Sequence, residues 1–135
     1  MTRFVVDART LLYLVDEKVP VHSDHQLVAP NAVRSEALGM LLADVRSGIR
    51  SEAEALERHE RMTEVKMRLL GDRVSRRTAW QIAREHDWED LRAAEYMAVT
   101  RLQADALVTV DPDLAAKADG VVRVCSIEEL THPDQ

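Results

Sequence analysis

The sequence predicts a three-layer α/β/α sandwich with a mostly parallel sheet of about five strands. Short apolar segments alternate with longer amphipathic ones along the whole chain, which is the pattern of strands followed by crossover helices. The short segments are apolar almost throughout, as expected of parallel strands that are buried on both faces. The length of 135 residues, of which 46% are hydrophobic, allows one domain with its own core. We expect this domain over residues 1–130 and a short tail over residues 131–135.

In the first half of the chain, three apolar segments predict strands, and three amphipathic segments predict helices. Pro30 marks the expected start of the second helix, because the first helical position needs no backbone N–H. Ser51 and Glu54 form a capping box that predicts the start of the third helix. The strands are expected over residues 4–6, 27–29 and 65–70, and the helices over residues 8–15, 32–45 and 52–62.

In the second half, a spacing of i, i+3, i+4 and i+7 predicts a helix with one apolar face. The residues with this spacing are Ala79, Ile82, Ala83 and His86. Asp87 is expected to cap a following helix that runs over residues 88–102. The remaining elements are expected to be strands over residues 106–109 and 121–125, a short helix over residues 112–118 and a final turn over residues 127–130.

Composition excludes several classes of function. Lys and Arg number 18 against 24 Asp and Glu, a net charge of −6, which argues against a protein that coats nucleic acid by bulk positive charge. An enzyme that reaches phosphate through metal ions remains compatible with this balance. The one cysteine excludes an internal disulfide and a zinc site with several cysteines. No apolar run approaches the ~18 residues of a membrane span and no signal peptide opens the chain, so we expect no membrane association and a cytoplasmic location.

Three acidic residues are predicted at one edge of the sheet. Asp7 directly follows the first strand, Asp111 follows the apolar segment that ends at Val110, and Glu36 lies about two turns into the helix after the second strand. The site of an open parallel sheet lies beyond the carboxyl ends of its strands, so these carboxylates are expected to gather there. They would repel one another unless protons or cations intervened. Oxygen ligands of this kind suit Mg²⁺ or Mn²⁺, which can activate water beside a phosphodiester.

Each of these acids also has a purely structural interpretation. Asp7 is placed to cap a helix, and Asp111 followed by Pro112 is a favourable start for another. Glu36 could be an exposed helix residue. Their shared position at one sheet edge favours a functional site.

The order of these motifs resembles that of PIN domains, and within that family the toxin nucleases of VapC type. The first match runs from Phe4 through Asp7 to Leu12, like a family opening strand that ends in Asp. The second runs from Leu27 through Pro30 to Glu36, and the third from Leu107 through Thr109 to Asp111, like the family's Thr-x-Asp. Residues 121–130 are similar to the family's last strand and closing turn.

The resemblance implies a three-layer fold and cleavage of single-stranded RNA with Mg²⁺ or Mn²⁺. Asp7, Glu36 and Asp111 would be the catalytic metal ligands, and Thr109 would orient Asp111 or a water on the ion. The toxin branch further implies a homodimer and a small antitoxin protein that covers the site. The alternative is a degenerate PIN domain that binds RNA or a protein partner without cutting.

The sequence departs from the family at two positions. The family usually has an Asp three residues before a Tyr; here Tyr96 sets the register, and Ala93 stands where the acid is expected. Glu89 and Asp90 are possible substitutes, at about 40° and 60° from Ala93 around a continuous helix, although acids in a first turn also offset the helix dipole. Arg9 stands where the family often has a small hydroxyl residue, and it is expected either to pair with Asp7 or to hold an RNA phosphate.

Aromatic and basic residues outside these motifs carry weaker signals. We expect Trp80 and Trp88 to be core or interface anchors, since no aromatic partner is spaced with them for base stacking. Several arginines could form a rim that guides phosphate, but most are expected to be ordinary solvated helix residues; they are Arg34, Arg76, Arg77, Arg84 and Arg101.

Overall fold

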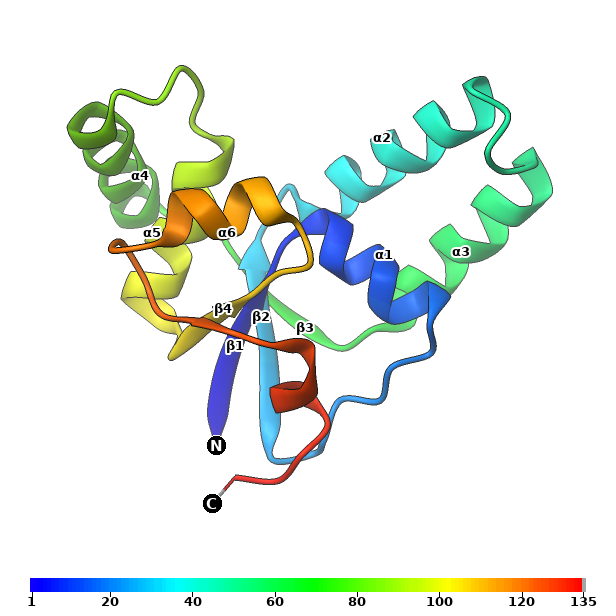
Figure 1. Cartoon of the computed structure of the whole chain (residues 1–135), viewed down its shortest axis with the longest axis horizontal. Coiled ribbons are helices and arrows are strands. Elements are labelled where there is room, and N and C mark those ends of the chain that lie inside the picture. Colours follow the sequence, from blue (N-terminus) through cyan, green and yellow to red (C-terminus); the bar gives the residue numbers. More distant parts are fainter. Residues whose placement is uncertain (135) are drawn as a thin grey trace.

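The computed structural model describes residues 1–134, which form a five-stranded, all-parallel sheet and six α-helices (Figure 1). The strands are β1 (Thr2–Val6), β2 (His25–Pro30), β3 (Met67–Leu70), β4 (Ala106–Val108) and β5 (Val124–Cys125). The helices are α1 (Ala8–Asp16), α2 (Val33–Arg46), α3 (Glu52–Glu64), α4 (Arg73–His86), α5 (Arg92–Gln103) and α6 (Pro112–Ala118), with a closing 3₁₀ helix over Ile127–Leu130. The predicted three-layer α/β fold is confirmed. None of the described helices is both long and apolar enough to cross a membrane.

The sheet has the order β3-β2-β1-β4-β5, so β1 lies at its centre. Val5 of β1 pairs in register with Val28 of β2 and Leu107 of β4, and all three belong to one core cluster. Phe4 and Val6, their neighbours along β1, belong to a second cluster. Because successive strand residues point to opposite faces, the sheet has an apolar core on both sides. The central residues of such strands must be apolar on both faces, which is the pattern that predicted the fold.

The helix expected to begin at residue 88 begins instead at Arg92. Asp87 has φ 55°, a left-handed conformation that Asp tolerates better than most residues, and it ends α4 rather than starting the next helix. The Trp88 N–H donates to the Ala83 carbonyl at 2.9 Å, which closes the end of α4 in the manner of a Schellman motif. Residues 87–91 are therefore a loop between α4 and α5.

Two other predicted boundaries were also wrong. Pro30 is the last residue of β2, and α2 begins at Val33, so Glu36 lies in its first turn rather than two turns in. The last strand is shorter than predicted because the Val121 and Val122 N–H groups both bond back to the Ala118 carbonyl. These two residues belong to the turn after α6, and only Val124–Cys125 pair with the sheet.

The capping box is confirmed at the start of α3, where the Ser51 hydroxyl accepts from the Glu54 N–H at 3.1 Å. The described part of the expected tail contacts the start of the chain. The Asp134 carboxylate accepts a hydrogen bond from the Thr2 hydroxyl and lies 3.5 Å from the amino group of Met1. Gln135, the last residue of that predicted tail, lies outside the described residues.

Candidate active site

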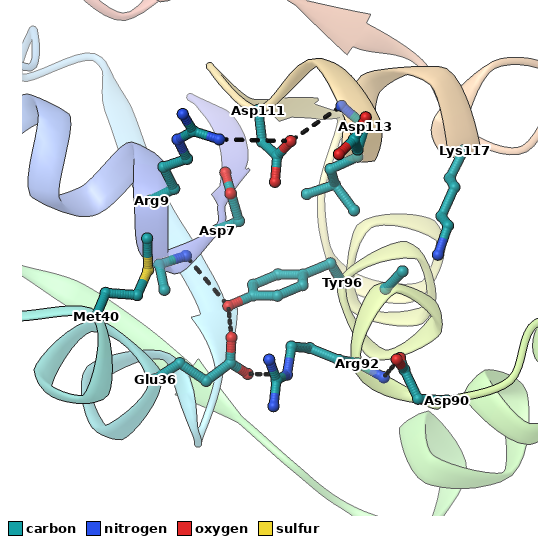
Figure 2. A pocket seen from close by; sticks show the side chains of 13 residues that line it. Asp7, Arg9, Glu36, Met40, Asp90, Arg92, Tyr96, Asp111, Asp113 and Lys117 are labelled. Atoms are coloured by element: carbon teal, nitrogen blue, oxygen red, sulfur yellow. Dashed lines mark hydrogen bonds and ion pairs between the residues drawn. The ribbon is translucent and has the colours of Figure 1, made fainter. Parts of the chain in front are cut away.

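A cleft of ≈ 390 Å³ opens at the carboxyl ends of the central strands, and all three predicted acids line it (Figure 2). Asp7 reaches it from the end of β1, Asp111 from the loop after β4, and Glu36 from the first turn of α2. The parallel strand order brings these three segments to one edge of the sheet, as the sequence predicted.

Asp7 occupies the position that precedes α1, yet its side chain makes no capping hydrogen bond. Only 4% of the residue is exposed, and the Thr10 hydroxyl donates a hydrogen bond to the carboxylate. Burial raises the pKa of Asp7, with a smaller contribution from the negative charge of Asp111, while the hydroxyls of Thr10 and Thr109 act to lower it. Among the described residues no Arg, Lys or His forms an ion pair with Asp7. Asp7 thus holds the N-cap position of α1 without capping the helix through its side chain, and its carboxyl group is buried with no cationic partner among the described residues.

Two threonines hold the polypeptide around Asp7. The Thr10 hydroxyl, besides donating to Asp7, accepts from the Val110 N–H at 3.0 Å and so ties α1 to the end of β4. The Thr109 hydroxyl accepts from the Asp111 N–H at 3.0 Å. Thr109 was predicted to orient Asp111, and it contacts the backbone of that residue. Thr10 was not predicted; its signal in the sequence is a hydroxyl three residues after a strand-ending Asp.

Asp111 is both a helix cap and a residue of the cleft. Its Oδ1 accepts from the Asp113 N–H at 2.9 Å, and Pro112 takes the first position of α6, so the capping interpretation is confirmed. Its side chain remains 28% exposed toward the cleft, where Arg9 Nη1 lies 3.9 Å from Oδ1. Arg9 thus pairs with Asp111 and not with Asp7, while most of its own side chain stays in solvent.

Tyr96 links Glu36 to the start of α1. Its hydroxyl donates to Glu36 Oε2 at 3.0 Å and accepts from the Ala8 N–H at 3.2 Å (Figure 2). Burial raises the pKa of Glu36, whereas the Tyr96 hydrogen bond and the charge of Arg92 act to lower it. Burial and the neighbouring Glu36 carboxylate move the pKa of Tyr96 far above its ordinary value, so the phenol stays a donor. In the sequence Tyr96 served only to set the register of the family motif.

Ala93 lines the cleft at the position of the expected third acid, and neither proposed substitute takes its place there. The Asp90 carboxylate lines the cleft but accepts from the Arg92 N–H at 3.0 Å, and in Figure 2 it lies beyond Arg92 as seen from Glu36. Glu89 is exposed and does not line the cleft. The helical geometry assumed for both residues does not apply, because they lie in the loop before α5.

The donor set of the cleft fits a hard divalent cation. Across residues 1–134 no three His, Cys, Asp or Glu side chains are gathered closely enough to hold an ion by themselves. Mg²⁺, however, is usually bound by one or two carboxylates and completes its shell with water and substrate phosphate. Asp7 supplies a buried carboxylate that lacks a cationic partner, and the charge of the neighbouring Asp111 disfavours its ionised form further. A cation would relieve both effects.

No protein-family model and no curated protein sequence matches this chain. Solved structures do match. The crystal structure of PAE2754 from Pyrobaculum aerophilum superposes with a TM-score of 0.71 at 23% identity, over 96% of this chain and 94% of that one. A structure of VapBC-1 from nontypeable Haemophilus influenzae superposes with a TM-score of 0.57 at 11% identity, over 93% of this chain and 98% of that one. At these identities the similarity shows the fold, which is the three-layer α/β fold that the sequence predicted.

Proposed function

We propose that the protein is a Mg²⁺- or Mn²⁺-dependent endoribonuclease that cleaves single-stranded RNA. The observation that carries the proposal is the Asp7 carboxylate, which is buried, does not cap its helix and has no cationic partner among residues 1–134. A buried carboxylate in this state costs several kcal/mol unless a proton or a cation neutralises it. Structural acids are normally paired, so an unpaired one that lies in a cleft with two further acids is better explained by a ligand.

The roles of the individual residues follow from their contacts. Asp7, Glu36 and Asp111 are the proposed ligands, and the chemistry that such a cation supplies is activation of water and stabilisation of charge at the scissile phosphate. Thr10 and Thr109 fix the position of Asp7, and Tyr96 fixes that of Glu36.

Two arginines of the cleft are the proposed contacts to the RNA backbone. Arg9 and Arg92 lie 3.9 and 4.0 Å from the nearest acid oxygens, and their side chains are 57% and 74% exposed. Pairs this long and this exposed are weak and can be exchanged for a phosphate, which the planar guanidinium binds with two parallel hydrogen bonds.

The proposed biological setting is a type II toxin–antitoxin pair. The sequence resemblance to VapC-type nucleases supports it, and a VapBC-1 structure has the same fold. In this setting the protein forms a homodimer, and a small antitoxin protein binds over the cleft.

The proposal is tested by Mn²⁺-dependent cleavage of a mixed single-stranded RNA pool. We expect the native protein to cut RNA with Mn²⁺ and not with EDTA, and Asp7→Asn to lose the activity. Asp119→Asn, an exposed position at the end of α6, is the matched control with the same change of charge and is expected to cut normally. Normal cleavage by Asp7→Asn would overturn the proposed site.

A second candidate function is binding without cleavage, and Ala93 is the observation that favours it. The wall of the cleft lacks an acid there, and Arg92 faces Glu36 from the adjacent position. An Ala93→Asp variant separates the two candidates. Activity of the native protein supports the nuclease, whereas an inactive native protein that gains Mn²⁺-dependent cleavage in Ala93→Asp supports a decayed site and a binding role.

A further inference from the structure

Helix α4 carries four arginines around an exposed tryptophan. We call this set the arginine stripe, and it consists of Arg73, Arg76, Arg77 and Arg84 around Trp80. At about 100° per residue, each of the four arginines lies within about 60° of Trp80 around the helix. Glu85, the only acid in α4, lies about 140° away from Trp80 on this count. A chain with a net charge of −6 therefore presents on α4 a basic face that contains no acid of this helix, with Asp72 just before the helix near Arg76.

The stripe is open to solvent and its arginines are not used by ion pairs. Trp80 is 59% exposed, which excludes the core position and leaves the interface position of the two that the sequence predicted. The ion pairs found over residues 1–134 involve other cations, and Arg76 donates instead to the Gly71 carbonyl at 2.9 Å. Burial of an indole is favourable and its exposure is costly, so a large exposed tryptophan among unpaired arginines indicates a contact surface.

We propose that the arginine stripe binds single-stranded RNA, with the guanidinium groups on backbone phosphates and the Trp80 indole stacked on an unpaired base. Sequence-tolerant binding of single strands combines a basic track with an aromatic platform in this way. An exposed indole stacks only on a base that is free of its partner strand, which favours single strands over duplex. The choice of RNA rests on the proposed ribonuclease function.

The position of α4 connects the stripe to the cleft. Its buried face, which includes Ala79 and Ile82, packs into the core beside α5, and α5 carries Arg92 and Tyr96 into the cleft. Figure 1 shows α4 at the outer edge of the molecule, with the connection to α5 running toward the end of the sheet where the acids lie. A strand bound on α4 would thus continue over the loop of residues 87–91 to Arg92.

The test is the affinity of a fluorescein-labelled single-stranded oligouridine for the full chain in EDTA, where no cleavage occurs. We expect Trp80→Leu to weaken binding roughly tenfold and Trp80→Phe to keep most of the affinity, because Phe can still stack. We expect the double variant Arg77→Gln/Arg84→Gln to lower the slope of log K against log salt by about 1.4, or ~0.7 for each lost phosphate contact.

The matched control is Arg46→Gln/Arg123→Gln, which removes the same charge from two exposed arginines outside α4. An equal loss in the control pair would mean that only net charge matters and would overturn the proposal. Unchanged affinity in Trp80→Leu, or tighter binding of single-stranded DNA than of RNA, would also overturn it.

Fluorescence gives a direct reading of the stacking contact. In a Trp88→Phe variant, Trp80 is the only tryptophan of the chain, and oligouridine is expected to quench its emission. Binding of a polyglutamate peptide serves as the alternative probe. If the stripe binds this peptide and the stripe variants keep their affinity for RNA, the stripe is a protein-docking surface and the proposal fails.

The outcome can be separated from that of the proposed nuclease. Binding of oligouridine is measured in EDTA, so the effect of the stripe variants is obtained without any contribution from cleavage. If Asp7→Asn loses cleavage and the stripe variants do not change the affinity for oligouridine, only this inference is overturned. Stripe-dependent binding by a chain that never cleaves overturns the nuclease alone.

Discussion

Asp7→Asn is expected to stabilise the protein in the absence of divalent cations. The effective cost of a buried ion is several kcal/mol, and Asp7 is 4% exposed with no cationic partner among residues 1–134. Hydroxyl groups offset part of this cost, since a hydrogen bond to a charged acceptor is worth about 1.5–3 kcal/mol against about 1 kcal/mol for a neutral one. An Asn carbonyl can still accept from Thr10, so the variant loses the charge and keeps the contact. The expected gain is about 1–2 kcal/mol in the free energy of unfolding, in the usual range for relief of active-site strain.

The sign of the pH dependence follows from the raised pKa of Asp7. A carboxyl whose pKa is higher in the folded state destabilises that state once it ionises, so the native protein loses stability as pH rises from 3.8 through the raised pKa. The advantage of Asp7→Asn is therefore full above the raised pKa and shrinks as the pH falls through it toward 3.8. Urea unfolding of both proteins in EDTA at several pH values measures it, with Asp119→Asn expected to stay within about 0.5 kcal/mol of the native protein. A clear loss of stability in Asp7→Asn at pH 7 would refute the reasoning and make the carboxylate a structural group.

Three other substitutions test the surroundings of the site and the core. Tyr96→Phe leaves the buried Ala8 N–H without its acceptor, and we expect urea unfolding to show a loss of about 1–3 kcal/mol together with reduced cleavage. Arg50→Ala leaves the half-buried Asp16 carboxylate without its two hydrogen bonds from Arg50, at 2.6 and 2.9 Å, and is expected to cost about 1–3 kcal/mol at pH 7. Because these bonds lower the pKa of Asp16, that loss should diminish as the pH falls below 3.8, and a loss that is the same at low pH would contradict the assignment. Leu41→Ala, at a position with no exposure, is expected to cost about 2–5 kcal/mol by leaving a cavity, and a change below about 1 kcal/mol would mean that the α2 packing is not as described.

The alternation of strands and helices and the gathering of the acids could be predicted from the sequence because both follow from long-range regularities. Continuous apolar segments identify parallel strands, and their carboxyl ends define one edge of the sheet, which placed Asp7, Glu36 and Asp111 together. The buried face of α4 follows from periodicity as well, since Ala79, Ile82 and Ala83 were predicted on one helix face and are buried, whereas the exposure of Trp80 was not predicted.

Some helix boundaries could not be predicted in this way, because the same residue type is compatible with two local conformations. Asp is favoured at helix starts and is also tolerated in the left-handed conformation at helix ends. Asp87 was therefore predicted to start a helix, whereas it ends α4. That error also misplaced Glu89 and Asp90. The pairing of Asp111 with Arg9 depends on side-chain geometry that no sequence spacing specifies.

Mn²⁺ binding measured by isothermal titration calorimetry tests most directly whether the cleft holds a divalent cation. The account predicts saturable binding to the native chain that Asp119→Asn keeps and Asp7→Asn loses. Absence of saturable binding in the native chain, or equal binding by Asp7→Asn, would contradict it.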